Sequence, residues 1–168
     1  MSSNICIKKI EENEISILSP LATAILREHF DPIIGKEQND YMLEKYQSIS
    51  AVKEQFHKGY LYYWVKYENK NVGFIAFYPI ENKLYLSKFY LLKEYRGKKI
   101  SRKMFEFIVK YAENQKLKSI YLNVNRNNEI PIKVYEHLGF VKIREEKNDI
   151  GNGFYMDDFV LEYEIKNT

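Results

Sequence analysis

The sequence has little cysteine, little histidine and no long apolar run, and each shortage argues against a class of protein. One cysteine, Cys6, among 168 residues excludes a disulfide framework. The three histidines, at positions 29, 57 and 137, lack the spacing of metal ligands, so no metal site is predicted. Neither a signal-peptide core nor a run of about 18 apolar residues occurs, so no membrane partner is expected. We therefore expect a soluble protein in the reducing cytoplasm.

What is abundant is ordinary for a globular domain. Hydrophobic residues make up 45% of the chain and charged residues 29%, which argues against disorder. The length predicts a single domain over residues 1–168, large enough for a core of its own. The net charge of +3 is too small to indicate a nucleic-acid partner by itself. The 15 tyrosines suit strands and pockets.

The first half of the chain predicts a strand, helices and then a meander. A short strand is expected around Ile5 and Ile7, and a helix over Ile15–Phe30 that breaks at Asp31–Gly35. Two short helices follow, at Tyr41–Tyr46 and at Ser50–His57, the second with Ser50 as its N-cap. Aromatic and β-branched runs predict three antiparallel strands, at Leu61–Tyr67, Val72–Tyr78 and Leu84–Leu92.

The second half predicts helices alternating with strands. A helix begins at Ile100, the strand Ser119–Val124 runs parallel to the strand before that helix, and a helix over Asn128–Leu138 ends at Gly139. Two final strands are expected at Phe140–Arg144 and Phe154–Ile165. The predicted fold class is a mixed α/β (α+β) sandwich. Its central sheet combines an antiparallel meander with a parallel βα unit, and helices cover both faces.

A basic loop before the helix at Ile100 is the clearest candidate binding site. The first-turn N–H groups of a helix, at the positive end of its dipole, attract anions. Four cationic side chains surround this point: Arg96, Lys98, Lys99 and Arg102. A phosphate or pyrophosphate fits this arrangement, and a solvated basic helix start is the alternative for the segment alone.

This loop resembles the pyrophosphate-binding motif of the GNAT superfamily of N-acetyltransferases, usually R/Q-x-x-G-x-G/A. Arg96 matches the first position, whereas Lys99 stands where glycine is usual and Ser101 where glycine or alanine is usual. We expect the turn to keep its form if the φ angle of Lys99 stays in the helical region. The ammonium of Lys99 and the hydroxyl of Ser101 would then add to the phosphate site.

A second segment strengthens the resemblance. Asn128, Tyr135 and the pair Gly139-Phe140 fall at the offsets of the family's N-x-x-A-x-x-x-Y-x-x-x-G-F segment, with Pro131 in place of alanine. The resemblance spans Leu61 to Ile165, and the joint order and spacing of the two motifs make it specific.

The resemblance implies acetyl-CoA as cosubstrate, held between two splayed parallel strands, Leu84–Leu92 and Ser119–Val124. A bulge in the first of these strands would aim a backbone N–H at the thioester carbonyl. The residues expected to contact the carrier are Phe89, Tyr90, Leu91, Arg96, Gly97, Lys98, Lys99, Ile100, Ser101, Arg102, Asn123, Asn128 and Tyr135. For Asn128, capping of the following helix is an equal alternative, and Asn125 is placed with Asn123 at the mouth of the second strand.

The implied reaction is direct transfer of an acetyl group to a primary amine of a small molecule. Tyr135 is the expected general acid, protonating the departing CoA sulfur. The general base is left open among Asp157, Asp158 and Glu81, which are also the substrate-side candidates. The acidic pair, and a likeness of Arg27–Phe30 to PaiA-like polyamine acetyltransferases of bacteria, favour a polyamine acceptor.

Two alternatives remain open at this point. A regulatory module that binds acyl-CoA without transferring the acyl group fits the same motifs. A nucleic-acid-binding module is disfavoured, because the apolar stripe Ile100, Met104 and Ile108 should bury the basic helix and leave too narrow a charged face. A homodimer is neither required nor excluded.

Overall fold

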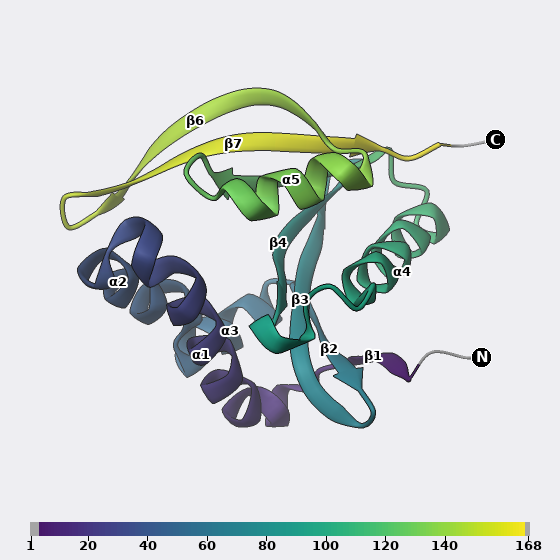
Figure 1. The fold of residues 1–168 in the computed structure, drawn as a ribbon, viewed down its shortest axis with the longest axis horizontal. Helices are drawn as coiled ribbons and strands as arrows, with labels where there is room; N and C mark the ends of the chain where they lie inside the picture. The colour runs from purple at the N-terminus through teal and green to yellow at the C-terminus, as the bar shows by residue number, and fades with distance from the viewer. Residues whose placement is uncertain (1–3, 167–168) are drawn as a thin grey trace. The chain divides into compact units, whose positions relative to one another are not determined.

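A computed structural model describes residues 4–166, and its elements follow the predicted order (Figure 1). A strand and three helices come first: β1 (Ile5–Lys9), the short 3-10 helix η1 (Glu12–Glu14), α1 (Ile15–Ile34), α2 (Lys36–Gln47) and α3 (Ile49–His57). The meander is β2 (Leu61–Tyr67), β3 (Lys70–Ile80) and β4 (Lys83–Leu91). The remainder is η2 (Lys93–Tyr95), α4 (Ile100–Asn114), β5 (Ser119–Asn125), α5 (Glu129–Leu138), β6 (Val141–Gly151) and β7 (Phe154–Glu164).

Helix α1 is longer than the sequence predicts. It continues through Pro32 to Ile34, so the expected break at Asp31 is wrong. The chain turns only at Gly35, whose φ is 87° and whose N–H donates to the Asp31 carbonyl at 3.0 Å. Helix α2 follows at once and is also longer than the predicted Tyr41–Tyr46. A glycine, which tolerates positive φ, sets this boundary in place of the proline.

Two further boundaries differ from the prediction. The N-cap of α3 is Ser48, whose hydroxyl accepts the Ala51 N–H at 3.2 Å, so the assignment of Ser50 is wrong. Strand β6 extends to Gly151, beyond the predicted end at Arg144. The first error arises because neighbouring serines carry the same capping signal, and only the hydrogen bond decides between them. The second arises because β6 is an exposed edge strand of mostly polar residues, which its pairing with β7 makes a strand.

The strands form one seven-stranded sheet in the order β1-β2-β3-β4-β5-β7-β6. The pairs β1–β2, β2–β3, β5–β7 and β6–β7 are antiparallel, whereas β4 and β5 are parallel, which confirms the mixed sheet. The parallel ladder is short, running from Lys83↔Ser119 to Tyr85↔Tyr121. Both strands continue past the last paired residues, β4 to Leu91 and β5 to Asn125.

The chain forms two compact units, each built from two stretches of sequence. The first comprises the residues up to Tyr78 and Lys88–Met104, and in it α1, α2 and α3 lie side by side (Figure 1). The apolar side of α1 shares a core with β2 and β3, made by Ile15, Leu18, Ala22, Ile25, Tyr62, Trp64 and Phe74. The buried amide of Asn39 ties α2 to α1 by donating to the Leu26 carbonyl at 3.2 Å.

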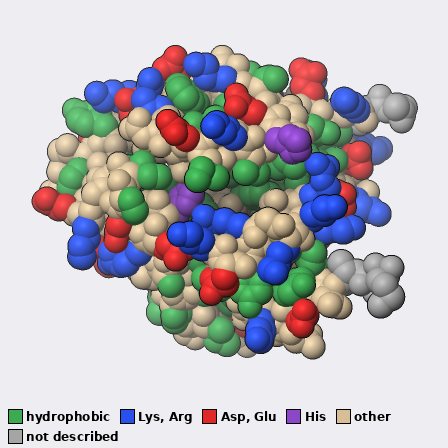
Figure 2. Space-filling model, viewed as in Figure 1, with side chains coloured by type: hydrophobic (Ala, Val, Ile, Leu, Met, Phe, Trp, Pro, Cys, Tyr) green, Lys and Arg blue, Asp and Glu red, His purple; other side chains and the backbone are tan. Residues whose placement is uncertain are grey.

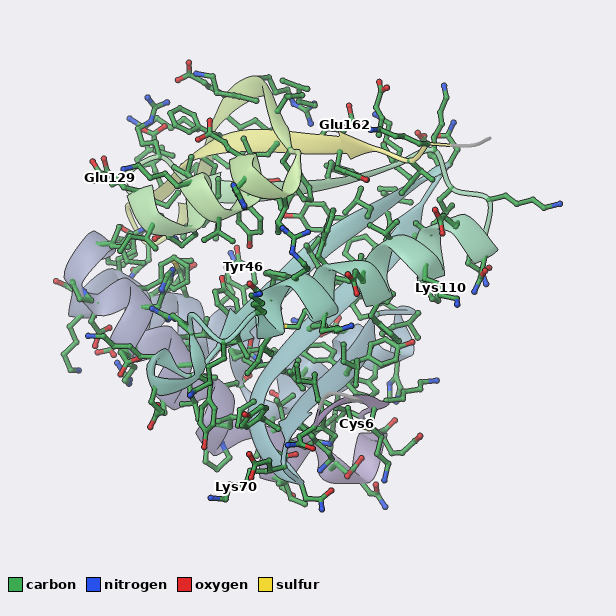
Figure 3. The ribbon with its side chains drawn as sticks, turned by 45° about the vertical axis from the view of Figure 1, so that its right-hand side comes forward. Cys6, Tyr46, Lys70, Lys110, Glu129 and Glu162 are labelled. Carbon is green, nitrogen blue, oxygen red and sulfur yellow. The ribbon has the colours of Figure 1, made fainter. Side chains whose placement is uncertain are left out.

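The second unit comprises Pro79–Ser87 and the chain from Phe105 onward. Helix α5 lies along the long hairpin of β6 and β7 (Figure 1). The ring of Phe105 on α4 contacts Tyr163 at 5.0 Å and Phe140 at 5.5 Å between centroids. Glu162, labelled on β7 in Figure 3, binds Lys83 at 2.7 Å. The prediction of a single domain stays a prediction.

The surface carries charges of both signs. Figure 2 shows Lys and Arg side chains interspersed with Asp and Glu over the visible face, as the small net charge implies. None of the helices within residues 4–166 combines the length and the apolar character that a membrane crossing requires.

Gly73 of β3 lies against β4 so closely that no side chain fits. A Cβ at this position would lie 2.3 Å from the Tyr90 carbonyl oxygen and 2.9 Å from a Leu91 methyl. The backbone oxygen cannot rotate aside as a side chain would. The close approach therefore fixes the backbone of β4 at Tyr90.

We predict that Gly73→Ala lowers the free energy of unfolding by about 1–3 kcal/mol, because β3 and β4 must separate to admit the methyl group. Denaturant unfolding monitored by circular dichroism measures this. The control is Gly59→Ala, where φ is 98° but nothing lies within 4 Å, so only the backbone conformation is penalised. Unchanged stability of Gly73→Ala would contradict the close contact.

Candidate active site

The loop between β4 and α4 has two residues with left-handed backbone. Gly97 has a φ of 80° and Lys99 a φ of 64°, and α4 begins directly afterwards at Ile100. The condition of a right-handed helical φ at Lys99 is therefore not met. Lys99 adopts the conformation that glycine takes without strain, at a cost of about 1–2 kcal/mol for a side-chain-bearing residue. The loop therefore has a left-handed turn at Lys99, and the backbone strain at this residue is the consequence.

The same loop presents cations that no carboxylate neutralises. Four side chains are exposed and, within residues 4–166, form no ion pair: Arg96, Lys98, Lys99 and Arg102. Ile100 is buried and anchors the start of α4, while Ser101 is half-buried. Unpaired cations beside the free N–H groups of a helix start make a strong site for phosphate.

The strand segment before the loop offers its backbone rather than its side chains. The side chain of Leu91 is buried, and the Tyr90 ring packs on Phe74 with centroids 5.8 Å apart. Phe89 is half-buried. Lys88, which precedes it, has its pKa lowered to about 8 by desolvation. The predicted bulge in β4 stays a prediction.

His29 of α1 belongs to the same unit and was not predicted. Its ring meets the Tyr90 ring edge-on, with centroids 5.8 Å apart. Burial, and then the charge of Arg96, lower the pKa of His29 to about 4, so the imidazole is neutral at neutral pH. The sequence holds a signal for it, because His29 lies four residues after buried Ile25 and so on the same face of α1.

In the second unit, Tyr135 of α5 has an environment suited to a neutral phenol. Its ring packs edge-on against Phe140 at 5.6 Å. Desolvation, and secondarily the neighbouring Tyr85, raise the pKa of Tyr135 above its ordinary value. Tyr85 is the last residue of β4 in the parallel ladder, so the phenol of Tyr135 lies near the point where β4 and β5 part. Tyr135 therefore stays protonated throughout the neutral range.

The two neighbouring aspartates of β7 have different surroundings. Asp157 forms an ion pair with Arg126, with Nε and Oδ1 2.8 Å apart. Asp158 is 7% exposed, and the Nδ2 of Asn123 donates to its Oδ2 at 3.4 Å. Burial is the largest cause that raises the pKa of Asp158, and Glu146 and Asp157 act in the same direction. A carboxylate of raised pKa is a better proton acceptor.

Of the remaining candidates, Asn125 of β5 is the cross-strand partner of Asp158. Glu81 is exposed in the turn between β3 and β4, just before the paired start of the parallel ladder. The Oδ1 of Asn125 accepts the Asn127 N–H at 2.9 Å, which makes it a turn residue. Asn128 is buried at the N-cap position of α5, but its side chain makes no capping bond, so the capping alternative is wrong. Across residues 4–166, no three His, Cys, Asp or Glu side chains are placed to hold a metal ion.

Comparison with known proteins identifies the family. Residues 23–140 match the model of the Acetyltransferase (GNAT) family, which is more than half of the chain. The chain belongs to the GNAT family. The motif loop at Arg96 and the helix that carries Tyr135 both lie within the matched range.

The similar proteins include named polyamine acetyltransferases. The chain is 35% identical over 83 residues to a probable spermine N(1)-acetyltransferase of Bacillus subtilis subsp. natto, and 34% identical over 83 residues to a spermine/spermidine N(1)-acetyltransferase of Bacillus subtilis. Each match covers 44% of this chain and 55% of the relative, so the chain spans about half the length of the curated relatives it matches.

Solved structures confirm the fold over nearly the whole chain. PaiA N-acetyltransferase of Thermoplasma acidophilum, in complex with coenzyme A, superposes with a TM-score of 0.78 at 23% identity, covering 98% of this chain and 99% of that one. A spermidine N-acetyltransferase of Vibrio cholerae gives 0.69 at 19% identity, covering 96% and 94%.

We predict that Lys99→Gly raises the free energy of unfolding by about 1 kcal/mol, because glycine adopts the left-handed φ without strain. Thermal and denaturant unfolding measure the difference. Lys98→Gly is the matched control, since it removes a neighbouring lysine from a position without positive φ. If both variants lose stability equally, Lys99 carries no strain.

Proposed function

We propose that this protein is an acetyl-CoA-dependent N-acetyltransferase that transfers the acetyl group to a primary amine of a small molecule. The observation that carries the proposal is the loop before α4, where Lys99 accepts a strained φ of 64° to keep the turn that a glycine would form. Strain of this kind persists where the surrounding structure or function requires it. Family membership supports the same reading.

The loop would hold the pyrophosphate of the carrier. First-turn N–H groups of α4 point toward the loop, and four exposed cations stand beside them: Arg96, Lys98, Lys99 and Arg102. The pantetheine arm has amide groups that pair with strand backbone as an added strand would. The strand that leads into the loop, β4, leaves its parallel ladder after Tyr85, so its later backbone groups supply that pairing. Phe89, Tyr90 and Leu91 are the contacts we propose.

The chemistry needs one proton acceptor and one proton donor. The acceptor removes a proton from the alkylammonium, and the neutral amine then attacks the thioester carbonyl. The tetrahedral intermediate collapses by breaking the C–S bond, and the sulfur receives a proton as free CoA forms. The amide nitrogen loses its second proton to the solvent, so the net products are the acetamide, CoA and one proton.

Tyr135 is the proposed donor to the sulfur. Reference pKa values near 10 for tyrosine and 8.5 for a thiol make complete transfer uphill by about 2 kcal/mol. The raised pKa of Tyr135 increases this cost but keeps the phenol protonated. A hydrogen bond from the phenol to the sulfur, formed as the C–S bond breaks, stabilises the developing thiolate before transfer is complete.

Asp158 is the proposed proton acceptor among the three carboxylates considered. Its burial raises its pKa, whereas Asp157 is neutralised by Arg126 and Glu81 lies on an exposed turn. A desolvated carboxylate also attracts an alkylammonium more strongly than an exposed one does. The loop proposed to bind the phosphates belongs to the first compact unit, whereas Tyr135 and Asp158 belong to the second.

A polyamine is the acceptor we favour. The named activities of the two Bacillus subtilis relatives support it, together with the carboxylates Glu146 and Asp158 facing each other across β6 and β7. A polyamine carries several ammonium groups, so one can react while another is held by charge.

The second candidate function is a module that binds acyl-CoA without transferring the acyl group. The raised pKa of Tyr135 favours it, because a weaker acid assists thiolate departure less. Nucleic-acid binding is not supported, since Ile100, Met104 and Ile108 of the basic helix are all buried.

The test combines acetyl-CoA with an amine panel of spermidine, spermine, aminoglycosides, amino acids and peptide amino termini, and measures thiol release and CoA affinity. We expect turnover of a polyamine. Tyr135→Phe should lower kcat by about 10²–10⁴-fold and leave CoA affinity nearly unchanged, because it removes only the donated proton.

Tyr163→Phe is the matched control, since the Tyr163 ring also packs on Phe140, at 5.7 Å, but is given no proton to donate. CoA binding without thiol release from any amine supports the regulatory module. Turnover of other amines but no polyamine refutes the acceptor alone.

A second test measures the effect of Asp158 on catalysis separately from its effect on the stability of the fold. Asp158→Asn should lower kcat/KM by about 100-fold, because the proton acceptor is lost. It should not destabilise the fold. The folded-state pKa of Asp158 is raised, so its contribution to stability is full below its unfolded pKa and is lost as pH rises through the folded value. The stability of the variant relative to the native chain should therefore increase over that range.

Asp157→Asn is the matched control. It breaks the ion pair with Arg126, which should cost at most about 1 kcal/mol, and it should leave kcat/KM nearly unchanged. Urea unfolding at several pH values, with steady-state kinetics, gives both quantities. An Asp158→Asn variant that is as active as the native chain would rule Asp158 out as the base.

A further inference from the structure

The side chain of Asn123 joins three other strands through hydrogen bonds. Its Oδ1 accepts the hydroxyl of Tyr85, on β4, at 3.2 Å. Its Nδ2 donates to Oε1 of Glu146, on β6, at 3.1 Å and to Oδ2 of Asp158, on β7, at 3.4 Å. These four residues lie within one compact unit.

The two carboxylates fix the orientation of the amide. An asparagine amide has an oxygen that only accepts and a nitrogen that only donates. Because ionised carboxylates only accept, the amide nitrogen of Asn123 is turned toward Glu146 and Asp158, and its oxygen is left to accept the hydroxyl of Tyr85. The reversed amide would place its oxygen against Glu146 and Asp158 and lose both bonds to the carboxylates, whereas the Tyr85 hydroxyl could bond to either end of the amide.

The arrangement has a clear electrostatic reason. Glu146 and Asp158 are direct cross-strand partners, and like charges in that position repel. The Asn123 amide bonds to both without adding a positive charge. A cation in its place would hold the two carboxylates more tightly but would also make Asp158 a weaker base.

The charged groups around Asp158 act on its pKa in opposite directions. Glu146 and Asp157 raise its pKa, and Arg126 lowers it, while burial is the largest influence. Glu146 is itself bound by Arg144, with Nε and Oε2 2.8 Å apart. The hydrogen bond from Asn123 favours the charged form of Asp158 and so lowers the pKa.

We propose that Asn123 is a positioning residue that holds the carboxylate of Asp158 ready for the amine proton, with Tyr85 anchoring the oxygen of the Asn123 amide. This rests on the proposed function, in which Asp158 is the proton acceptor. It gives Asn123 a role on the acceptor-amine side, distinct from the carrier contact expected of it from the sequence.

The test is the pH dependence of kcat/KM with acetyl-CoA and the best amine of the panel. In Asn123→Ala the charged form of Asp158 loses a donor, so the acidic limb of the profile should move to higher pH by about 0.5–1 unit. Below that limb, kcat/KM should fall correspondingly, by about 3–10-fold. Tyr85→Phe should shift the limb in the same direction by less, because the amide loses the hydrogen bond that anchors its oxygen.

Two control variants probe the same strands. Ser119→Ala removes a hydrogen bond of 2.7 Å from Ser119 of β5 to the carboxylate of Glu162 on β7. Tyr121→Phe removes the hydroxyl of the ring that meets Tyr85 at 4.9 Å. Both should leave the acidic limb at its native position, because neither touches Asn123 or Asp158.

The outcomes separate this proposal from the function on which it rests. An Asp158→Asn variant that keeps native activity defeats the choice of base. If Asp158→Asn is inactive while Asn123→Ala keeps the limb at the native pH, the positioning role is wrong, even if kcat falls. If Asn123→Ala does not fold, Tyr85→Phe decides, since it keeps the ring packed on Tyr121. An unmoved limb in a folded Tyr85→Phe then overturns the proposal.

Discussion

The short parallel ladder between β4 and β5 is the constraint on which the candidate chemistry depends. Three residue pairs join the strands, and both strands then continue apart from each other. Backbone groups that leave a ladder need other partners, and an extended ligand with amides can provide them. The start of the ladder is held by Glu162, which binds both Lys83 and Ser119 at 2.7 Å. The carrier proposed above would pair with the backbone of β4 beyond this ladder.

In β7, the alternation of side chains between the two faces of the sheet gives two adjacent aspartates different surroundings. Asp157 and Asp158 are adjacent in sequence, yet their side chains point to opposite faces of the sheet. One meets Arg126 and forms an ordinary ion pair, and the other is buried beside an uncharged amide. The buried carboxylate is destabilising when charged, and that same cost makes it a better base. We interpret this destabilisation by Asp158 as a sign of a functional role.

In the loop before α4, the cost lies in the backbone conformation of one residue. Lys99 keeps the left-handed turn that a glycine would adopt freely, and gains a cation at the proposed phosphate site. The departure from the family motif therefore preserves the shape of the loop and adds charge. The cost lies in conformational strain of the folded chain rather than in lost contacts.

The sequence by itself determined the order of the elements, the mixed sheet, the loop before α4 and the helix that carries Tyr135, because these depend on local periodicity and on spacing along the chain. It misplaced the end of α1 and the cap of α3, where several neighbouring residues carry the same signal. Only the tertiary structure distinguished Asp158 from Asp157, gave Asn123 its partners and placed His29 against Tyr90. Those distinctions depend on strand register and burial, which bring together residues far apart in sequence, and no local pattern encodes them.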